Sequence, residues 1–151
     1  NKYANEQKLL PLIMLFTLDN DYKHVINKSI ILGNDNVSLL LSLNGLITMP
    51  DEYKTSDKWY TWRNEHWGVK WEPCDQKIKI EKDKYIIKCD TPWCPPINWA
   101  HNVCIKYNVN IDIYFCESEM GFCGFTRFRY KDGAYQSKTI QMEYNENDDS
   151  G

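Results

Sequence analysis

The amino-acid sequence predicts an α+β protein in which an antiparallel sheet carries helices on one face, preceded by a helical N-terminal segment. Three observations predict this class. Residues 110–117 alternate apolar and polar side chains, as a half-buried strand does. The Asp132-Gly133 pair joins two strand-like stretches, and Trp59, Trp62 and His66 recur at helical spacing. Strands and helices in this succession are typical of an α+β domain.

The first fifty residues predict short helices separated by polar breaks. The stretches at 5–18, 22–32 and 36–46 show no period-two alternation, and glycines follow or end two of them. Pro11 would then occupy the first turn of its helix. We therefore expect residues 1–50 to pack as a helical layer or lid, with the boundary at Pro50.

Two helices are predicted beyond this boundary. Ser56 or Asp57 can cap the first helix, which Gly68 ends. Pro95 and Pro96 open the second helix, which runs to about residue 107. Both helices carry an apolar stripe that a sheet could cover.

The strands are predicted by alternation and by turn residues. Residues 77–81 and 84–90 flank a short turn and form a hairpin, and residues 110–117 form a single strand. A last hairpin covers residues 122–130 and 134–142. We expect residues 56–144 to form one domain, followed by an acidic, flexible tail at 145–151.

The charge and hydropathy of the chain limit its partners. Its 151 residues carry a formal net charge of −3, which argues against a general nucleic-acid binder, although a local basic strip is compatible with it. The longest apolar run, residues 9–18, is about half the length that crosses a bilayer. We expect no membrane partner and a cytoplasmic location.

The cysteines are interpreted as thiols in the core. A chain of this length can bury a self-sufficient core, so it needs no disulfide framework. No CxxC pair is present, whereas structural zinc and iron-sulfur sites usually take two ligands from one such loop. We expect no metal and no cofactor. The cysteines are Cys74, Cys89, Cys94, Cys104, Cys116 and Cys123.

No catalytic constellation is evident. A nucleophilic cysteine needs a positioned base, and the histidines are His24, His66 and His101. Cys94 with His101 is the pair to test first, because Cys94 precedes a helix whose N-terminus could lower the pKa of its thiol. His101 lies about two turns into that helix, however, so we expect no such pair and no enzyme.

The aromatic residues allow two interpretations. They can seal the core, which we favour for the tryptophans, or they can stack on bases if cations lie among them. Arg127 and Arg129 point to one side of their strand, opposite Phe128 and Tyr130, and could form a cationic strip on the sheet or an ordinary solvated face. The candidate binding residues are Arg63, Lys70, Arg127 and Arg129.

Three stretches together resemble a known family. They are WYTWRNEHWGVKW at residues 59–71, TPWCPP at 91–96, and YFCESEMGFCG at 114–124. They look like the ferredoxin-like domain typified by YubB, found in proteins of bacteriophages and conjugative plasmids. The resemblance covers residues 57 to about 140 and departs from the family pattern at Pro92, Cys94 and Ser118-Glu119. It implies a fold and a mobile-element origin, and no agreed reaction.

These observations lead to ranked functional expectations. We expect a non-catalytic phage or plasmid accessory protein that binds and inhibits a host or defence component in the bacterial cytoplasm. A CRISPR effector or another immune nuclease is an example, and an acidic, aromatic-rich domain could cover its basic surface. The alternative is a single-stranded nucleic-acid binding module that uses the sheet face with Arg127 and Arg129. A thiol enzyme at Cys94 is the third hypothesis.

Overall fold

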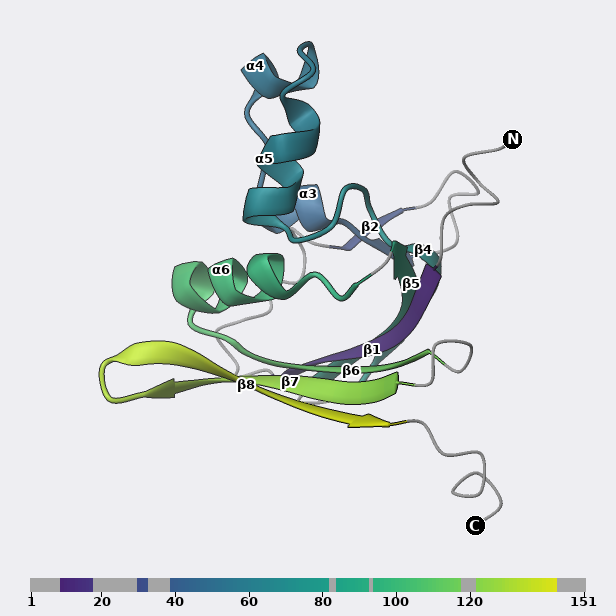
Figure 1. The fold of residues 1–151 in the computed structure, drawn as a ribbon, viewed down its shortest axis with the longest axis vertical. Helices are drawn as coiled ribbons and strands as arrows, with labels where there is room; N and C mark the ends of the chain where they lie inside the picture. The colour runs from purple at the N-terminus through teal and green to yellow at the C-terminus, as the bar shows by residue number, and fades with distance from the viewer. Residues whose placement is uncertain are drawn as a thin grey trace.

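The computed structural model describes residues 9–17, 30–32, 39–81, 84–92, 94–117 and 122–143 (Figure 1). The strands are β1 (Leu9–Thr17), β2 (Ile30–Leu32), β3 (Leu39–Leu41), β4 (Cys74–Ile80), β5 (Lys84–Pro92), β6 (Asn110–Glu117), β7 (Phe122–Lys131) and β8 (Ala134–Glu143). The helices are α3 (Leu43–Leu46), α4 (Asp51–Lys54), α5 (Trp59–His66) and α6 (Ile97–Tyr107).

Six strands form one sheet in the order β4-β5-β1-β6-β7-β8, and every neighbouring pair is antiparallel. The succession β1, α5, β4, β5, α6, β6 is the β-α-β-β-α-β order of a ferredoxin-like fold, and β7 with β8 adds a hairpin at one edge. The labelled helices all lie on one side of this sheet (Figure 1). The predicted antiparallel sheet with helices on one face is thereby confirmed.

The helical prediction for residues 5–18 is wrong over residues 9–17, which form β1 in the middle of the sheet. A nine-residue, mostly apolar run without alternation fits a buried strand as well as a helix, and no turn signal within it distinguishes the two. Pro11 is tolerated because it pairs with Asp90 of β5, while pairing with β6 begins only at Leu12. Its missing N–H is therefore not needed on the β6 side.

In the next two stretches the helical prediction is wrong for residues 30–32 and 39–41 and is confirmed for residues 43–46. Ile30–Leu32 and Leu39–Leu41 pair as a two-stranded ribbon, and only Leu43–Leu46 is helical. The boundary at Pro50 does not separate a helical layer from the sheet, since β1 lies between β5 and β6. The predicted tail at 145–151 lies outside the described residues.

The remaining predicted elements are confirmed. Helices α5 and α6, the β4–β5 hairpin strands and β6 lie where periodicity places them. Asp132 and Gly133 have φ of 54° and 85°, so the β7–β8 turn has two residues in the left-handed region. That is the backbone a two-residue type I′ hairpin requires, and it explains why Asp-Gly predicts the turn.

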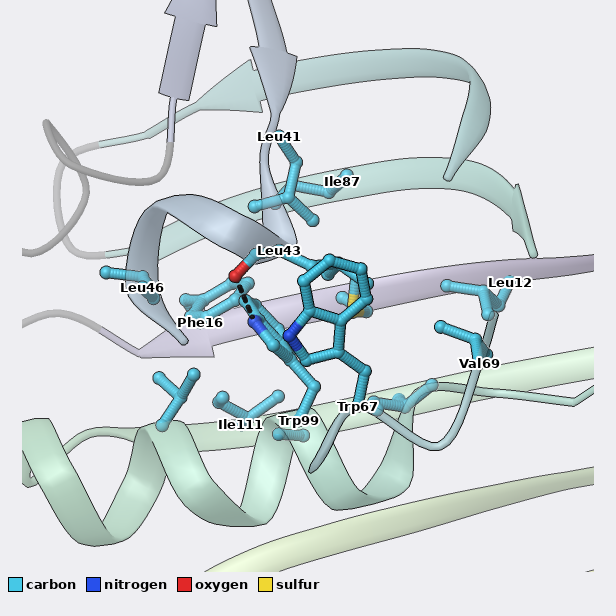
Figure 2. Packing of buried hydrophobic residues seen from close by; sticks show 14 of the residues in the cluster. Leu12, Phe16, Leu41, Leu43, Leu46, Trp67, Val69, Ile87, Trp99 and Ile111 are labelled. Atoms are coloured by element: carbon cyan, nitrogen blue, oxygen red, sulfur yellow. Dashed lines mark hydrogen bonds between the residues drawn. The ribbon is translucent and has the colours of Figure 1, made fainter. Parts of the chain in front are cut away.

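The core lies between the sheet and the helices and is centred on tryptophan (Figure 2). Trp99 of α6 is fully buried, meets Phe16 edge to face, and donates its Nε1–H to the Leu43 carbonyl oxygen over 2.9 Å. Trp67 is also buried and donates to the Ile47 carbonyl oxygen over 2.9 Å. Each indole thereby fills the core and satisfies a backbone acceptor of the N-terminal segment. The core interpretation is confirmed for these two and for Trp62.

The cysteines divide into two groups. Cys74, Cys89, Cys94 and Cys104 are free, and Cys89 and Cys104 are buried, as predicted. The thiol interpretation is wrong for Cys116 and Cys123, which form a disulfide. They stand directly opposite each other on β6 and β7, with Cα atoms 4.0 Å apart, a register that the spacing of the two residues alone does not reveal.

Candidate functional site

The side of the six-stranded sheet away from the helices is the candidate site, and we call it the open face. Side chains alternate along each strand, so the residues between the buried ones point to this side. On β1 the buried residues include Leu12 and Met14, and Ile13 between them is 38% exposed. No described helix covers this face (Figure 1).

A row of apolar side chains crosses the centre of the open face. Ile13, Tyr114, Phe125 and Ile140 stand opposite one another on β1, β6, β7 and β8, and we call them the apolar row. Tyr114 is 40% and Ile140 37% exposed. The rings of Tyr114 and Phe125 are stacked, with centroids 5.6 Å apart and planes at 28°. The row thus presents aromatic surface to solvent.

Cations lie at the β5 end of the apolar row and beside its β7–β8 end. The register continues from Ile13 to Lys88 of β5 and on to Lys77 of β4, so the row ends in two lysines. Beside Phe125 on β7 lies Arg127, which pairs with Lys138 of β8. The β4–β5 cations are Lys77, Lys79, Lys84 and Lys88, and the β7–β8 cations are Arg127, Arg129 and Lys138.

Two of these cross-strand pairs join like charges. Lys77 stands opposite Lys88, and Arg127 stands opposite Lys138. Like charges directly opposite each other on an antiparallel pair destabilise the sheet. Such local conflicts with folding are expected where a surface serves binding, and an anionic ligand would remove the repulsion.

Asp112 of β6 organises the two arginines. Its side chain is 4% exposed and accepts from both guanidinium groups, at 3.2 Å from Arg127 Nε and at 2.9 and 3.0 Å from the two terminal nitrogens of Arg129. The Arg127 and Arg129 side chains remain 49% and 38% exposed. The charge of Asp112, with the hydrogen bonds that Arg127 donates to Tyr114 and Asp112, raises the pKa of Arg127. Asp112 therefore holds both arginines in place, and guanidinium N–H groups that it does not bind remain available to a ligand.

The other two predicted binding residues lie on the side of the sheet that carries α3 to α6, which we call the helical layer (Figure 1). The Arg63 guanidinium lies over Trp59 and Trp67, 5.2 and 5.1 Å from the ring centroids, and donates to the Lys70 carbonyl oxygen over 3.0 Å. Lys70 in turn lies 4.8 Å from the ring centroid of Trp71. The structure thus brings Arg127 and Arg129 together on the open face and leaves Arg63 and Lys70 on the opposite side of the sheet.

Cys94 and His101 have separate partners. The Cys94 sulfur lies 3.1 Å from the Gly68 carbonyl oxygen, and His101 Nε2 lies 3.0 Å from the Tyr135 carbonyl oxygen. Partial burial raises the pKa of the Cys94 thiol, which is the opposite of the direction that a nucleophilic thiol requires. This arrangement offers no support for a thiol nucleophile at Cys94.

One group of potential metal ligands occurs among the described residues. Ligand atoms of Cys74, Asp75 and Asp90 all lie within 4.8 Å of one another, where β4 meets the end of β5. Burial, followed by the charge of Asp75 and a hydrogen bond with it, raises the pKa of Asp90. Three ligands from a thiol and two carboxylates fall short of the four that structural zinc takes, so we assign no metal to them.

Comparison with known proteins identifies the domain. The model of a family described as "Ferredoxin-like domain in Api92-like protein" matches residues 66–150. The chain belongs to this family. No curated protein and no solved structure gives a significant match. The family agrees with the sheet described above and supplies no reaction, so the function has to be argued from the open face.

Lys88 and Tyr114 were not among the predicted binding residues, although the alternation along their strands indicates the side to which they point. Alternation along residues 84–90 and 110–117 places Lys88 and Tyr114 on the polar side of their strands. What it could not supply was the strand order, because β1 was expected to be helical. Without β1 between β5 and β6, the lysines of β4 and β5 and Tyr114 of β6 would not lie on one surface.

No described helix is long and apolar enough to cross a membrane.

Proposed function

We propose that this domain binds single-stranded nucleic acid across its open face, without catalysis. The observation that carries the proposal is the continuous register Lys77, Lys88, Ile13, Tyr114, Phe125, Ile140, which has two lysines at its β4–β5 end. At the other end, Arg127 and Lys138 lie two residues along β7 and β8 from Phe125 and Ile140. Proteins that bind single strands combine a basic track for the phosphates with aromatic rings on which bases stack.

The aromatic surface favours a single strand over a duplex. Bases within a duplex stack on one another and present only their edges, whereas unpaired bases can lie on Tyr114 and Phe125. Arg127 adds a planar cation 5.7 Å from the Phe125 centroid, which can also stack on a base. Because no described helix covers this face (Figure 1), a strand can cross it without entering a channel.

The net charge of −3 is compatible with this function because the open face carries more cations than acids. Exposed acids occur in the helical layer, among them Asp51, Glu52, Asp57 and Glu65. On the open face Asp112 is buried beneath two arginines, and Glu81 lies 3.4 and 3.5 Å from Lys79 and Lys84. Phosphates approaching this face meet cations first, and the potential there matters more than the total charge.

Fluorescence anisotropy with a labelled twelve-residue oligothymidylate tests the proposal. We expect binding at low ionic strength that weakens as salt is raised, and weaker binding of a duplex of the same length. Arg127→Gln should weaken binding, whereas Lys58→Gln, at an exposed lysine of the helical layer, should not. Absence of binding to both DNA and RNA oligomers at low salt would refute the proposed function.

The expectation of an inhibitor of host defence stays a prediction. It depends on a net acidic domain that covers a basic surface of the partner, whereas the open face carries more cations than acids. This distribution favours nucleic acid as the partner. A mobile-element origin and a location in the bacterial cytoplasm, which the resemblance implies, remain part of the proposal.

A further inference from the structure

A shallow hollow lies in the open face beside Tyr114. It encloses about 220 Å³ and lies over β5, β1 and β6, lined by Pro11, Leu12, Ile13, Lys88, Tyr114, Phe115 and Cys116. The lining is mostly apolar, and Tyr114 belongs to it. Drug-sized ligands usually fill about 300–1,000 Å³, so the hollow is matched to a smaller group.

We infer that this hollow is a subsite for one unpaired nucleobase of the strand. The inference rests on the proposed function and adds to it the place at which the base is held. In the register Ile13 stands between Lys88 on one side and Tyr114 on the other. The base lies over Ile13 against the Tyr114 ring, and the ammonium of Lys88 binds a phosphate of the same strand.

The charge around the hollow selects this occupant over an apolar peptide side chain. Lys88 lines the hollow, Lys77 stands opposite Lys88 on β4, and Arg127 lies beyond Tyr114 on β7. These three cations outnumber Asp90, the acid that stands opposite Pro11 on β5. A complementary ligand has a flat, weakly polar group with a negative charge on each side of it. Each negative charge lies about one strand spacing from that group. A nucleotide in a single strand has a planar base and a phosphate on each side of its sugar.

The tyrosine hydroxyl also has a defined place. Tyr114 hydrogen-bonds with Arg127, and its ring stacks on Phe125. These contacts hold the ring, so that little side-chain freedom remains to be lost when a base stacks on it. The next base can then stack on Phe125 and Arg127, and the strand direction is across the sheet from β5 to β7.

Tyr114→Leu is the decisive variant because it keeps apolar volume and removes the ring. Tyr130→Leu is its matched control, since Tyr130 is an exposed tyrosine whose side chain lies on the other side of β7. Both variants are titrated with the labelled twelve-residue oligothymidylate and with an abasic oligomer of the same length. Thermal denaturation verifies that each variant is folded.

We expect Tyr114→Leu to weaken oligothymidylate binding about fivefold or more, with little change for the abasic oligomer and none for Tyr130→Leu. If the unaltered protein binds neither oligomer, the proposed function fails. If it binds, and Tyr114→Leu binds oligothymidylate as tightly as the unaltered protein, the subsite is wrong and the function stands. If Tyr114→Leu does not fold, two single variants, Tyr114→Phe and Lys88→Ala, replace it. Tyr114→Phe should bind oligothymidylate as the unaltered protein does, because it keeps the ring, and Lys88→Ala should lose affinity for both oligomers.

Discussion

The salt dependence of binding tests the electrostatic argument most directly, with Lys88 and Lys138 neutralised together as the perturbation. These lysines lie on opposite flanks of the apolar row, and both are exposed. Neither occupies the core, so Lys88→Ala/Lys138→Ala should fold normally. Lys54→Ala/Lys58→Ala, at two exposed lysines of the helical layer, is the matched control.

The expected magnitude follows from the charges near the open face. The seven cations of the two flanks exceed the four nearby acids, Asp75, Glu81, Asp90 and Asp112, by three. About three phosphate contacts give a slope of log K against log salt of about −2, because each contact with a single strand contributes about −0.7. Affinity should then fall about 20-fold from 50 to 200 mM salt.

The double variant should retain about one contact, a slope of about −0.7, and a loss of about threefold over the same range of salt. The assay is anisotropy of the labelled oligothymidylate at several salt concentrations, and the slope is the measured quantity. The control variant should keep the slope of the unaltered protein. Equal slopes for the double variant and the unaltered protein would refute the assignment of phosphate contacts to these flanks.

Three further predictions concern the fold that presents this face. Trp99→Phe should lower the free energy of unfolding by about 1–3 kcal/mol in urea denaturation, because it removes the indole hydrogen bond to the Leu43 carbonyl oxygen, which then keeps only the Ile47 N–H, and opens a cavity. Gly124→Ala should cost about 1–3 kcal/mol in the same assay, because the new Cβ would meet a β8 backbone carbonyl oxygen at 2.5 Å; unchanged stability would contradict the β7–β8 register. In the native protein a thiol reagent at pH 8 should label Cys94, faster as pH rises, and spare Cys104 until the chain unfolds, since burial raises the pKa of the Cys104 thiol to about 12. Native labelling of Cys104, read by mass spectrometry, would contradict its burial.

The strands from residue 77 onward were predictable because their two faces differ. Residues 110–117 alternate between a buried side and the open face, and Asp132-Gly133 supplies the backbone of a tight turn. In β1 the difference is absent, since Leu12 and Ile13 are equally apolar although one is buried and the other is 38% exposed. A helix and a central strand then share one sequence pattern, and the register with β5 and β6 decides between them.

Only two of the four predicted binding residues lie on the open face, because sequence alone does not show what a cation near aromatic residues contacts. Arg127 and Arg129 lie on a strand whose alternation fixes the side to which they point. Arg63 lies on a helix in which tryptophans recur on both sides of it, and its guanidinium is taken up between Trp59 and Trp67. A cation near aromatic residues in sequence can therefore hold a core together, and only the fold distinguishes that role from binding a base.

The position of Asp112 connects the stability of this fold with its proposed function. A buried carboxylate on the open face would weaken any site for phosphate unless its charge were already satisfied, and both arginines satisfy it. One acid is thereby surrounded by two cations, leaving about one positive charge directed outward beside Phe125. A conformationally free pair of arginines would lose more side-chain entropy on binding a strand than this preorganised pair does. For Asp112→Asn, whose neutral side chain keeps the shape but releases both guanidinium groups, two effects therefore compete: more positive charge tightens binding at low salt, and lost orientation weakens the contribution of stacking on Phe125.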